Sequence, residues 1–266
     1  MKYLYLIGFL CCFISTNMLS KDYDASLFGI ESDGRTMNTN SIQKAINFIH
    51  KQGGGRLIFH VGRYLSGSIY LRSNVTLHLK EGAVLLGSTN PFDYEYNEEW
   101  TAFIFGLNQD SIAITGKGII DGQGYQVAQN LVSLIQKGVV EDPRFSNDRP
   151  YARIRPQNIY FKGCRHILIQ GIQVNNPASW NQQFDQCSHL IIDQIKADCK
   201  NYWNNDGIDI VDCDSVIVKN SFFDASDDAI CLKSHHPKFR CKDILIYNNT
   251  IRSSASAIKF GTYTFG

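Results

Sequence analysis

The sequence predicts an all-β fold, a right-handed parallel β-helix with a capping helix at its N-terminal end. Short apolar triplets recur along the chain, and their starts step by 23, 26 and 28 residues. The triplets are Ile167–Ile169, Leu190–Ile192, Val216–Val218 and Ile244–Ile246. Repeats of about 20–30 residues without a helix in each are typical of stacked strands, and right-handed winding is the default for parallel crossovers. Leucine-rich repeats are the alternative, but their leucine and asparagine framework is absent.

One repeat of this pattern carries acidic residues. Asn205–Ile210 superimposes on Asp227–Leu232 after a shift of 22 residues, which places Asp206 on Asp228. Because stacked strands lie about 4.8 Å apart, these carboxylates are expected to be neighbours on one face. An isolated Asp-Asp pair more often bonds the backbone of a turn. Three acids gathered on one ribbon, with Asp227 as the third, are instead the arrangement that glycoside hydrolysis needs.

An amphipathic helix is predicted ahead of the strands, over Ser41–Lys51. Its apolar side chains recur at i, i+3, i+4 and i+7, namely Ile42, Ala45, Ile46 and Ile49. Asn40 is a suitable N-cap, and Gly53–Gly55 ends the helix. A helix in this place is expected to cover the open end of the core of the stack.

The rest of the chain is expected to form one domain over residues 21–266. Arg56–Phe59, Val75–Leu79 and Ile112–Ile114 are further strands of the stack. Residues 122–156 interrupt the rhythm with charges and prolines, and we expect a long loop beside a groove there. The chain stops at Gly266 after a strand and without a cap, so we expect the β-helix to be incomplete at its C-terminus.

The composition and the N-terminal residues limit the classes to which this protein can belong. A net charge of +1 argues against nucleic-acid binding. Residues 1–20 are typical of a signal peptide, which predicts export to the periplasm or the medium. Lipoprotein anchoring through Cys11 or Cys12 is the less favoured alternative, because no small residues precede them. No segment is long enough to span a membrane, and we expect a monomer.

Cysteine usage permits two interpretations. Six cysteines follow the expected leader, and an even number in an exported protein permits disulfides. Four of them stand just before the apolar strand of their repeat: Cys164, Cys187, Cys213 and Cys241. We favour free thiols that stack on one another in the core of successive coils, because a long stack of strands does not need disulfide cross-links for stability.

Several motifs in order carry a family resemblance. From about Asp24 onward the chain resembles the polygalacturonase family, glycoside hydrolase family 28, within the pectate-lyase-like β-helix superfamily. The matching segments are 32–34, 53–55, 67–71, 85–89, 114–122 and 176–180. The family's Asn-Thr-Asp stands here as Asn204-Asn205-Asp206, and its paired aspartate as Asp227-Asp228.

The resemblance implies inverting hydrolysis of pectin or a related acidic polysaccharide, without a metal or cofactor. Asp227 would protonate the leaving oxygen, while Asp206 and Asp228 would position and deprotonate water. Crowded carboxylates cannot all ionise cheaply, which favours one protonated acid. Lys233 and Lys259 would hold an acidic sugar.

Three further residues near these motifs are considered. Asn205 is a further candidate for substrate contact. Trp180 precedes Asp206 by one coil, as a sugar platform or as packing. Asp209 is interpreted as lining the groove or solvated.

The chain departs from the family pattern at two points. The family's Gly-His-Gly coil is replaced by a segment in which Ser256 takes the aspartate position and Lys259 stands level with Asp209. The family's later Arg-Ile-Lys is absent. Three functions therefore stay open: a polygalacturonase-type glycosidase, which we favour, a non-catalytic or degenerate carbohydrate-binding β-helix, and a calcium-dependent lyase.

Overall fold

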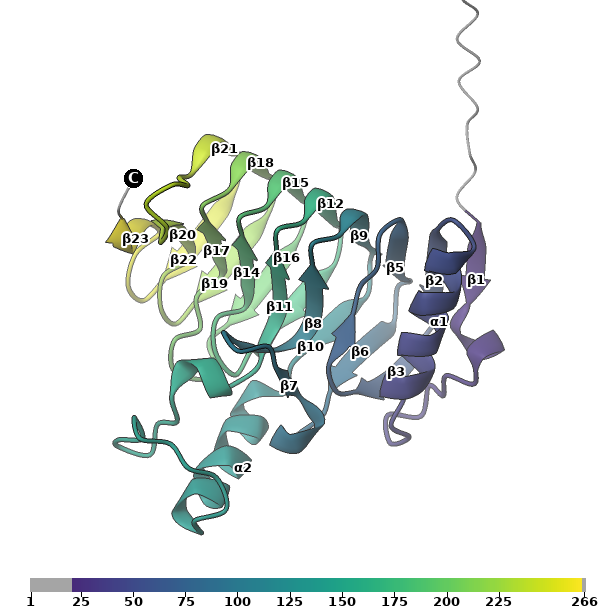
Figure 1. Cartoon of the computed structure of the whole chain (residues 1–266), viewed down its shortest axis with the longest axis horizontal. Helices are drawn as coiled ribbons and strands as arrows, with labels where there is room; N and C mark the ends of the chain where they lie inside the picture. The colour runs from purple at the N-terminus through teal and green to yellow at the C-terminus, as the bar shows by residue number, and fades with distance from the viewer. Residues whose placement is uncertain (1–20, 265–266) are drawn as a thin grey trace, which may run out of the picture.

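A computed structural model describes residues 21–264, and these residues wind into a stack of three parallel sheets (Figure 1). Sheet A contains β1 (Asp22–Asp24), β2 (Gly55–Phe59), β5 (Val75–Leu79), β9 (Asp110–Gly116), β12 (Arg165–Gln170), β15 (Ser188–Asp193), β18 (Asp214–Lys219) and β21 (Lys242–Tyr247). Sheet B contains β3 (Gly62–Ser66), β6 (Ala83–Gly87), β10 (Ile119–Asp121), β13 (Gln173–Asn175), β16 (Lys196–Cys199), β19 (Phe222–Ala225) and β22 (Thr250–Ser253). Sheet C contains β4 (Ile69–Tyr70), β8 (Thr101–Leu107), β11 (Gln157–Lys162), β14 (Gln182–Asp185), β17 (Ile208–Val211), β20 (Ile230–Ser234) and β23 (Ile258–Thr264), and β7 (Glu95–Tyr96) pairs antiparallel with β8. The predicted β-helix is confirmed.

The predicted triplets stack in register within sheet A. Ile167 pairs with Leu190, Leu190 with Val216, and Val216 with Ile244. The period-2 alternation of these strands turns one face inward, so the first and third residues of the triplets from β12 to β18 are buried, while Ile191 between them is exposed. The apolar alternation therefore sets both the winding and the core.

The capping helix α1 spans Thr39–Lys51 and begins two residues before the predicted start. Asn38, not Asn40, is the N-cap residue, because its carbonyl accepts the first helical bond from the Ile42 N–H at 2.8 Å. The predicted apolar face is fully buried, over the first strands of the stack (Figure 1). Gly54 follows at φ +117°, where a Cβ would lie 2.5 Å from the Asn74 carbonyl oxygen. Only glycine fits this turn.

The predicted long loop over residues 122–156 is wrong in part, because it contains the helix α2 (Gly124–Gln136). Val127, Ala128, Leu131 and Val132 form its buried face, at helical spacing. In Figure 1 the helix projects below the stack. Three single-turn 3-10 helices complete the described elements: η1 (Ala25–Phe28), η2 (Pro91–Asp93) and η3 (Ala152–Ile154).

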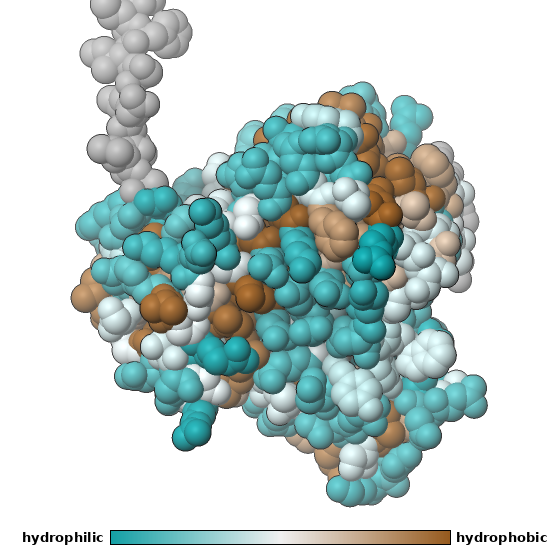
Figure 2. Space-filling model, turned by 180° about the vertical axis from the view of Figure 1, so that it is seen from behind, coloured by the Kyte–Doolittle hydropathy of each residue, from teal (hydrophilic) through white to brown (hydrophobic). Residues whose placement is uncertain are grey.

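The last coils leave apolar side chains in contact with solvent. Phe260 is 76% exposed and Ile258 is 45% exposed. Figure 2 shows brown and tan surface at this end of the stack, and further brown patches toward the middle and the opposite end. No helix in residues 21–264 is long and apolar enough to cross a membrane. The predicted signal peptide and the alternative lipoprotein cysteines lie outside the described residues.

The cysteines of the stack are free thiols, as predicted. Cys187, Cys213 and Cys241 each donate to a carbonyl of the preceding coil, at 3.2–3.4 Å. Five of the six described cysteines are buried, and Cys241 is partly buried. They act as small apolar side chains that also satisfy backbone acceptors.

Candidate active site

The acidic repeat forms a column at the entry to sheet C. Each of β14, β17 and β20 follows a turn out of sheet B, and the backbones of these turns are bonded coil to coil. The Asn181 N–H donates to the Asp206 carbonyl at 2.9 Å, and the Gly207 N–H donates to the Asp228 carbonyl at 2.9 Å. The predicted neighbourhood of Asp206 and Asp228 is therefore confirmed. Trp180 stands one coil before Asp206, also as predicted.

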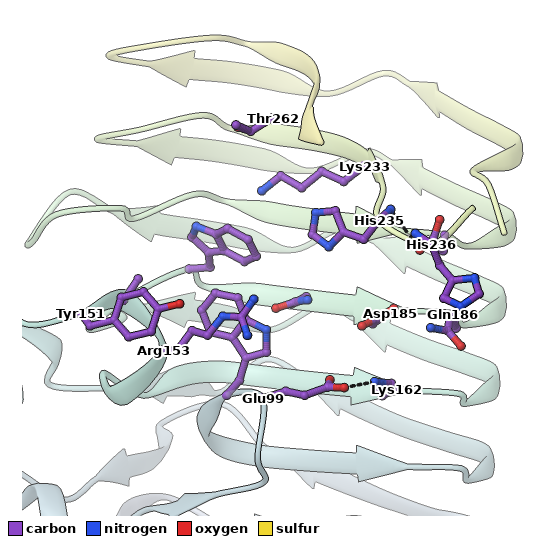
Figure 3. Close-up of a pocket in the computed structure, with 15 residues that line it drawn as sticks. Glu99, Tyr151, Arg153, Lys162, Asp185, Gln186, Lys233, His235, His236 and Thr262 are labelled. Atoms are coloured by element: carbon purple, nitrogen blue, oxygen red, sulfur yellow. Dashed lines mark hydrogen bonds and ion pairs between the residues drawn. The ribbon is translucent and has the colours of Figure 1, made fainter. Parts of the chain in front are cut away.

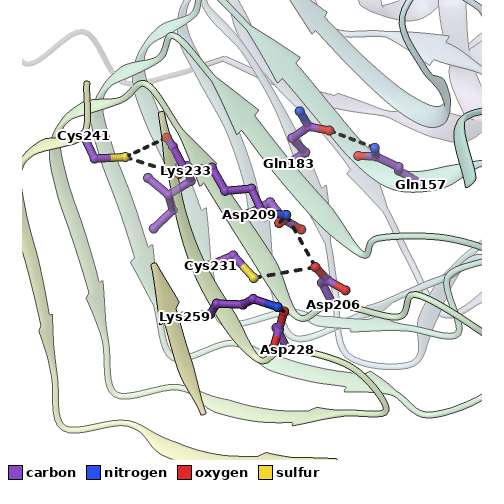
Figure 4. Close-up of polar contacts among 10 residues, drawn as sticks. Gln157, Gln183, Asp206, Asp209, Asp228, Cys231, Lys233, Cys241 and Lys259 are labelled. Atoms are coloured by element: carbon purple, nitrogen blue, oxygen red, sulfur yellow. Dashed lines mark hydrogen bonds and ion pairs between the residues drawn. The ribbon is translucent and has the colours of Figure 1, made fainter. Parts of the chain in front are cut away.

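Asp206 and Asp228 are both buried, each only 4% exposed, and lie beside the Cys231 thiol (Figure 4). One carboxylate oxygen of Asp206, one of Asp228 and the Cys231 Sγ all lie within 4.8 Å of one another. Lys259 donates to Asp228 Oδ2 at 2.7 Å, while the Lys233 ammonium lies 3.7 Å from Asp206 Oδ2. Lys259 thus pairs directly with Asp228, and Lys233 supplies positive charge near Asp206. Asp228 Oδ1 has no hydrogen-bond partner within residues 21–264.

An ion pair with Asp209 holds the Lys233 side chain beside Asp206. Asp209 is fully buried and forms an ion pair with the Lys233 ammonium, which corrects the prediction that Asp209 lines the groove or is solvated. Burial alone would lower the pKa of Lys233, but Asp209 and then Asp206 raise it. Burial, and next the charge of Asp209, raises the pKa of Asp206. The lysine predicted to hold a sugar carboxylate is therefore already paired inside the protein.

Asp227 takes a different position from its neighbours. It is half-buried and lines a cavity of about 590 Å³ between α2 and the turn around residues 200–205, together with Tyr125 and Tyr202. The charge of Asp227 contributes to the raised pKa of Asp206. Since Asp227 directly precedes Asp228 in the chain, one half-buried carboxylate adjoins the two buried ones.

Asn205 is fully buried, and within residues 21–264 its side chain bonds only to backbone groups. Its amide donates to the carbonyls of Pro177 and Ser179, at 3.0 and 2.8 Å, and its Oδ1 accepts from the Tyr202 N–H at 2.7 Å. These contacts fix the turn that leads to Asp206. The prediction of direct substrate contact by Asn205 is corrected to a role in holding the acidic turn.

Arg155, which belongs to none of the motifs, is fully buried under the site. Its guanidinium donates to the carbonyls of Pro150, Ala178 and Trp203 and to Asn204 Oδ1, at 2.6–3.0 Å. Burial lowers the pKa of Arg155 to about 10, so it stays charged at neutral pH. It ties the 122–156 segment to the turns that carry the acids.

A second cavity, of about 670 Å³, lies on the outer face of sheet C (Figure 3). We call it the tryptophan pocket, because Trp100 and Trp180 line it with ring centroids 4.6 Å apart. Three carboxylates also line it: Glu99, Asp185 and Asp212. Lys233 connects the pocket to the acidic column, since its ammonium lies 3.6 Å from the centroid of the Trp180 ring. Trp180 therefore both packs against Lys233 and lines a cavity.

Asp185 is a buried acid with a measurable consequence. Burial raises its pKa to about 6, against partial compensation by Lys162. Between pH 4 and 6 the folded protein keeps a proton that the unfolded chain has lost, so the free energy of unfolding falls as the pH rises through this window. We expect Asp185→Asn to be more stable than the parent by about 2 kcal/mol at pH 7.5 and nearly equal to it at pH 4. Urea denaturation at both pH values measures this, and an equal difference at both would contradict it.

Comparison with known proteins decides the family. The model of the glycosyl hydrolases family 28 matches residues 60–255. The chain belongs to this family. An exo-poly-alpha-D-galacturonosidase of Dickeya chrysanthemi is 23% identical over 94% of the chain and 49% of its own length. A probable polygalacturonase of Vitis vinifera is 29% identical over 80% of the chain and 44% of its own length. The chain thus spans about half the length of these relatives.

Solved structures of similar fold support the family assignment. A protein of Parabacteroides merdae assigned to the glycosyl hydrolases superposes with a TM-score of 0.75 and 34% identity, over 86% of this chain and 95% of that one. An exopolygalacturonase of Thermotoga maritima gives 0.73 and 25% identity, over 92% and 63%. The resemblance seen in the sequence, and the right-handed β-helix it implied, are confirmed.

Both acidic motifs of family 28 lie inside the matched region, and the departure from the family lies at its edge. Ser256 follows the acids in the column, because its carbonyl accepts from the Ala229 N–H at 2.9 Å. Lys259 pairs with Cys231 on the adjacent strand and donates to Asp228. In this member of the family a lysine ammonium, not an imidazole, lies beside the second acidic motif.

Proposed function

We propose that this chain hydrolyses glycosidic bonds of pectin or a related acidic polysaccharide, with inversion at the anomeric carbon. The observation that carries the proposal is the close grouping of one half-buried aspartate, Asp227, with two buried ones, Asp206 and Asp228, on family 28 motifs. The curated relatives that carry polygalacturonase names support the choice of substrate.

The roles proposed for the three aspartates follow from how far each side chain is exposed. Asp227 borders a cavity, so its carboxyl group reaches the glycosidic oxygen and gives it a proton as the bond to the anomeric carbon breaks. A water molecule attacks the opposite face of that carbon. Its proton passes to Asp228, which is ion-paired with the Lys259 ammonium, while buried Asp206, whose pKa is raised, positions the water. Inverting enzymes hold their two carboxyl groups about 6.5–9.5 Å apart to admit this water. The Lys259 ammonium compensates the charge of Asp228, and the Lys233 ammonium, which pairs with Asp209, lies 3.7 Å from Asp206.

A product assay tests the proposal. Purified protein is incubated with polygalacturonate and with rhamnogalacturonan, and reducing ends are measured beside the absorbance of unsaturated uronides. We expect new reducing ends without that absorbance. Unsaturated products would indicate a lyase, and no product from a folded sample would indicate a carbohydrate-binding β-helix.

Replacing Lys259 separates two roles for this residue. The ammonium is already bonded to Asp228 at 2.7 Å, and this bond raises the pKa of Lys259, so the group stays charged. We expect Lys259→Met to lower kcat about 10- to 100-fold with little change in KM, since a charge-assisted hydrogen bond to an acid of the site is lost. Lys259→Arg should restore much of the rate. A rise in KM alone would instead assign Lys259 to substrate binding, as the sequence suggested.

A further inference from the structure

Trp180 links the lysine of the acidic column to the aromatic wall of the tryptophan pocket. The centroid of its ring lies 3.6 Å from the Lys233 ammonium and 4.6 Å from the centroid of the Trp100 ring. Arg153 in turn lies over the Trp100 ring, 5.2 Å from its centroid. Since cations are attracted to the faces of indole rings, these four side chains form a connected stack with a cation at each end.

Trp100 gives this stack a fixed support. Only 6% of Trp100 is exposed, and it belongs to an apolar cluster with Phe105 and Tyr160, against which Trp180 packs. A side chain that is held between a buried ring and an ammonium group has little room to change its rotamer. Trp180 is therefore a rigid wall on which the Lys233 side chain rests.

The Lys233 ammonium has three neighbours. It forms an ion pair with buried Asp209, lies over the Trp180 ring, and is 3.7 Å from Asp206 Oδ2. Only 5% of the Lys233 side chain is exposed, so little water competes for the ammonium. The ion pair with Asp209 holds it in one direction, and the ring face holds it in another. Its distance from Asp206 follows from these two contacts together.

We propose that Trp180 is a positioning residue, which acts through Lys233 to hold positive charge beside Asp206. The inference rests on the proposed function, in which Asp206 positions the attacking water. Asp206 is 4% exposed, and Lys233 is its one ion-pair partner within residues 21–264. An ammonium that moves away leaves this buried acid without compensating charge. The role of Trp180 is then neither that of a sugar platform nor that of packing alone.

Kinetics of paired variants test this role, on whichever polysaccharide the product assay shows to be cleaved. We expect Trp180→Leu to lower kcat about tenfold and to change KM by less than about twofold, because a desolvated cation–π contact is lost but no substrate contact. Trp180→Phe keeps a ring face and should retain more than about a third of the parental kcat. Tyr247→Leu, which removes an exposed ring from β21 on sheet A, is the matched control and should change neither constant.

A second background shows whether Trp180 acts through Lys233. Lys233→Met with Asp209→Asn removes both charges of the buried pair, which is far less damaging to the fold than removing one. Adding Trp180→Leu to this double variant should lower kcat by less than about twofold, because the ammonium that the ring holds is already gone. Urea denaturation gives the same comparison without substrate. Trp180→Leu should lower the urea midpoint at least about twice as far in the parent as in the double variant.

Four results would overturn the inference. Equal losses of kcat in both backgrounds, or failure of Trp180→Leu to fold in both, would assign Trp180 to packing. A rise in KM with kcat unchanged would assign it to a sugar platform. Equal losses in Trp180→Phe and Trp180→Leu would show that the ring face has no role. Folding of Trp180→Leu in the double variant alone would support the coupling to Lys233.

The urea midpoints separate this inference from the proposed function. A folded protein that yields no product refutes hydrolysis, but the contact of Trp180 with Lys233 is then still decided by the midpoints. Equal midpoint shifts in the two backgrounds refute the coupling, whether or not the protein is active.

Discussion

Asp227→Asn is expected to abolish most of the turnover while substrate binding is retained. The amide has nearly the shape of the carboxyl group but gives no proton to the leaving oxygen, and general acid catalysis contributes about 10²- to 10⁴-fold. Because Asp227 is half-buried at the edge of a cavity, the change should leave the fold intact. Reducing-end release measures kcat, and calorimetry measures binding to the same substrate.

The matched control for this variant is Asp243→Asn, which removes an exposed carboxylate from β21 on sheet A. It should keep parental kcat and KM. Retention of more than about a tenth of the parental rate by Asp227→Asn would remove this residue from the role of general acid. A loss of binding equal to the loss of rate would point to substrate contact instead.

Lys233→Met is expected to give the largest loss of stability among single substitutions near the site. Lys233 is 4% exposed and Asp209 is fully buried, so the change leaves a buried carboxylate without its partner. Breaking such a pair from one side costs about 3–5 kcal/mol of the free energy of unfolding. Urea denaturation at neutral pH measures the loss.

A double variant tests the physical cause. Lys233→Met with Asp209→Asn removes both charges, so much of the lost stability should return, and the two effects should be far from additive. Additive losses, or a cost below about 1 kcal/mol for Lys233→Met alone, would contradict the account of a buried pair whose charges depend on each other.

The sequence predicts the acidic column well, because a solenoid converts sequence spacing into spatial neighbourhood. Once the 22-residue shift aligns Asp206 with Asp228, the register of β17 with β20 follows, and Lys259 falls level with Cys231. Helix α2 was missed because charges and prolines further along the same segment masked its apolar face. In this segment the spacing of the apolar residues indicates the helix, whereas the overall composition suggests a loop.

The partners of the charged side chains could not be predicted from motifs. Lys233 was assigned to substrate because it follows the acid pair, yet its ammonium points to Asp209 of the previous coil (Figure 4). Asp185 belongs to no motif, although the register places it between Lys162 and Val211. Such contacts depend on side-chain direction and on the depth of burial, which spacing alone does not give.

The most direct test of the central claim is the anomeric configuration of the first product, followed by proton NMR during hydrolysis. Proton donation by Asp227 and water activation by Asp206 and Asp228 predict that the new reducing end appears first with inverted configuration and then mutarotates. A first product of retained configuration would contradict the account, because it would require a covalent intermediate on one of these carboxylates.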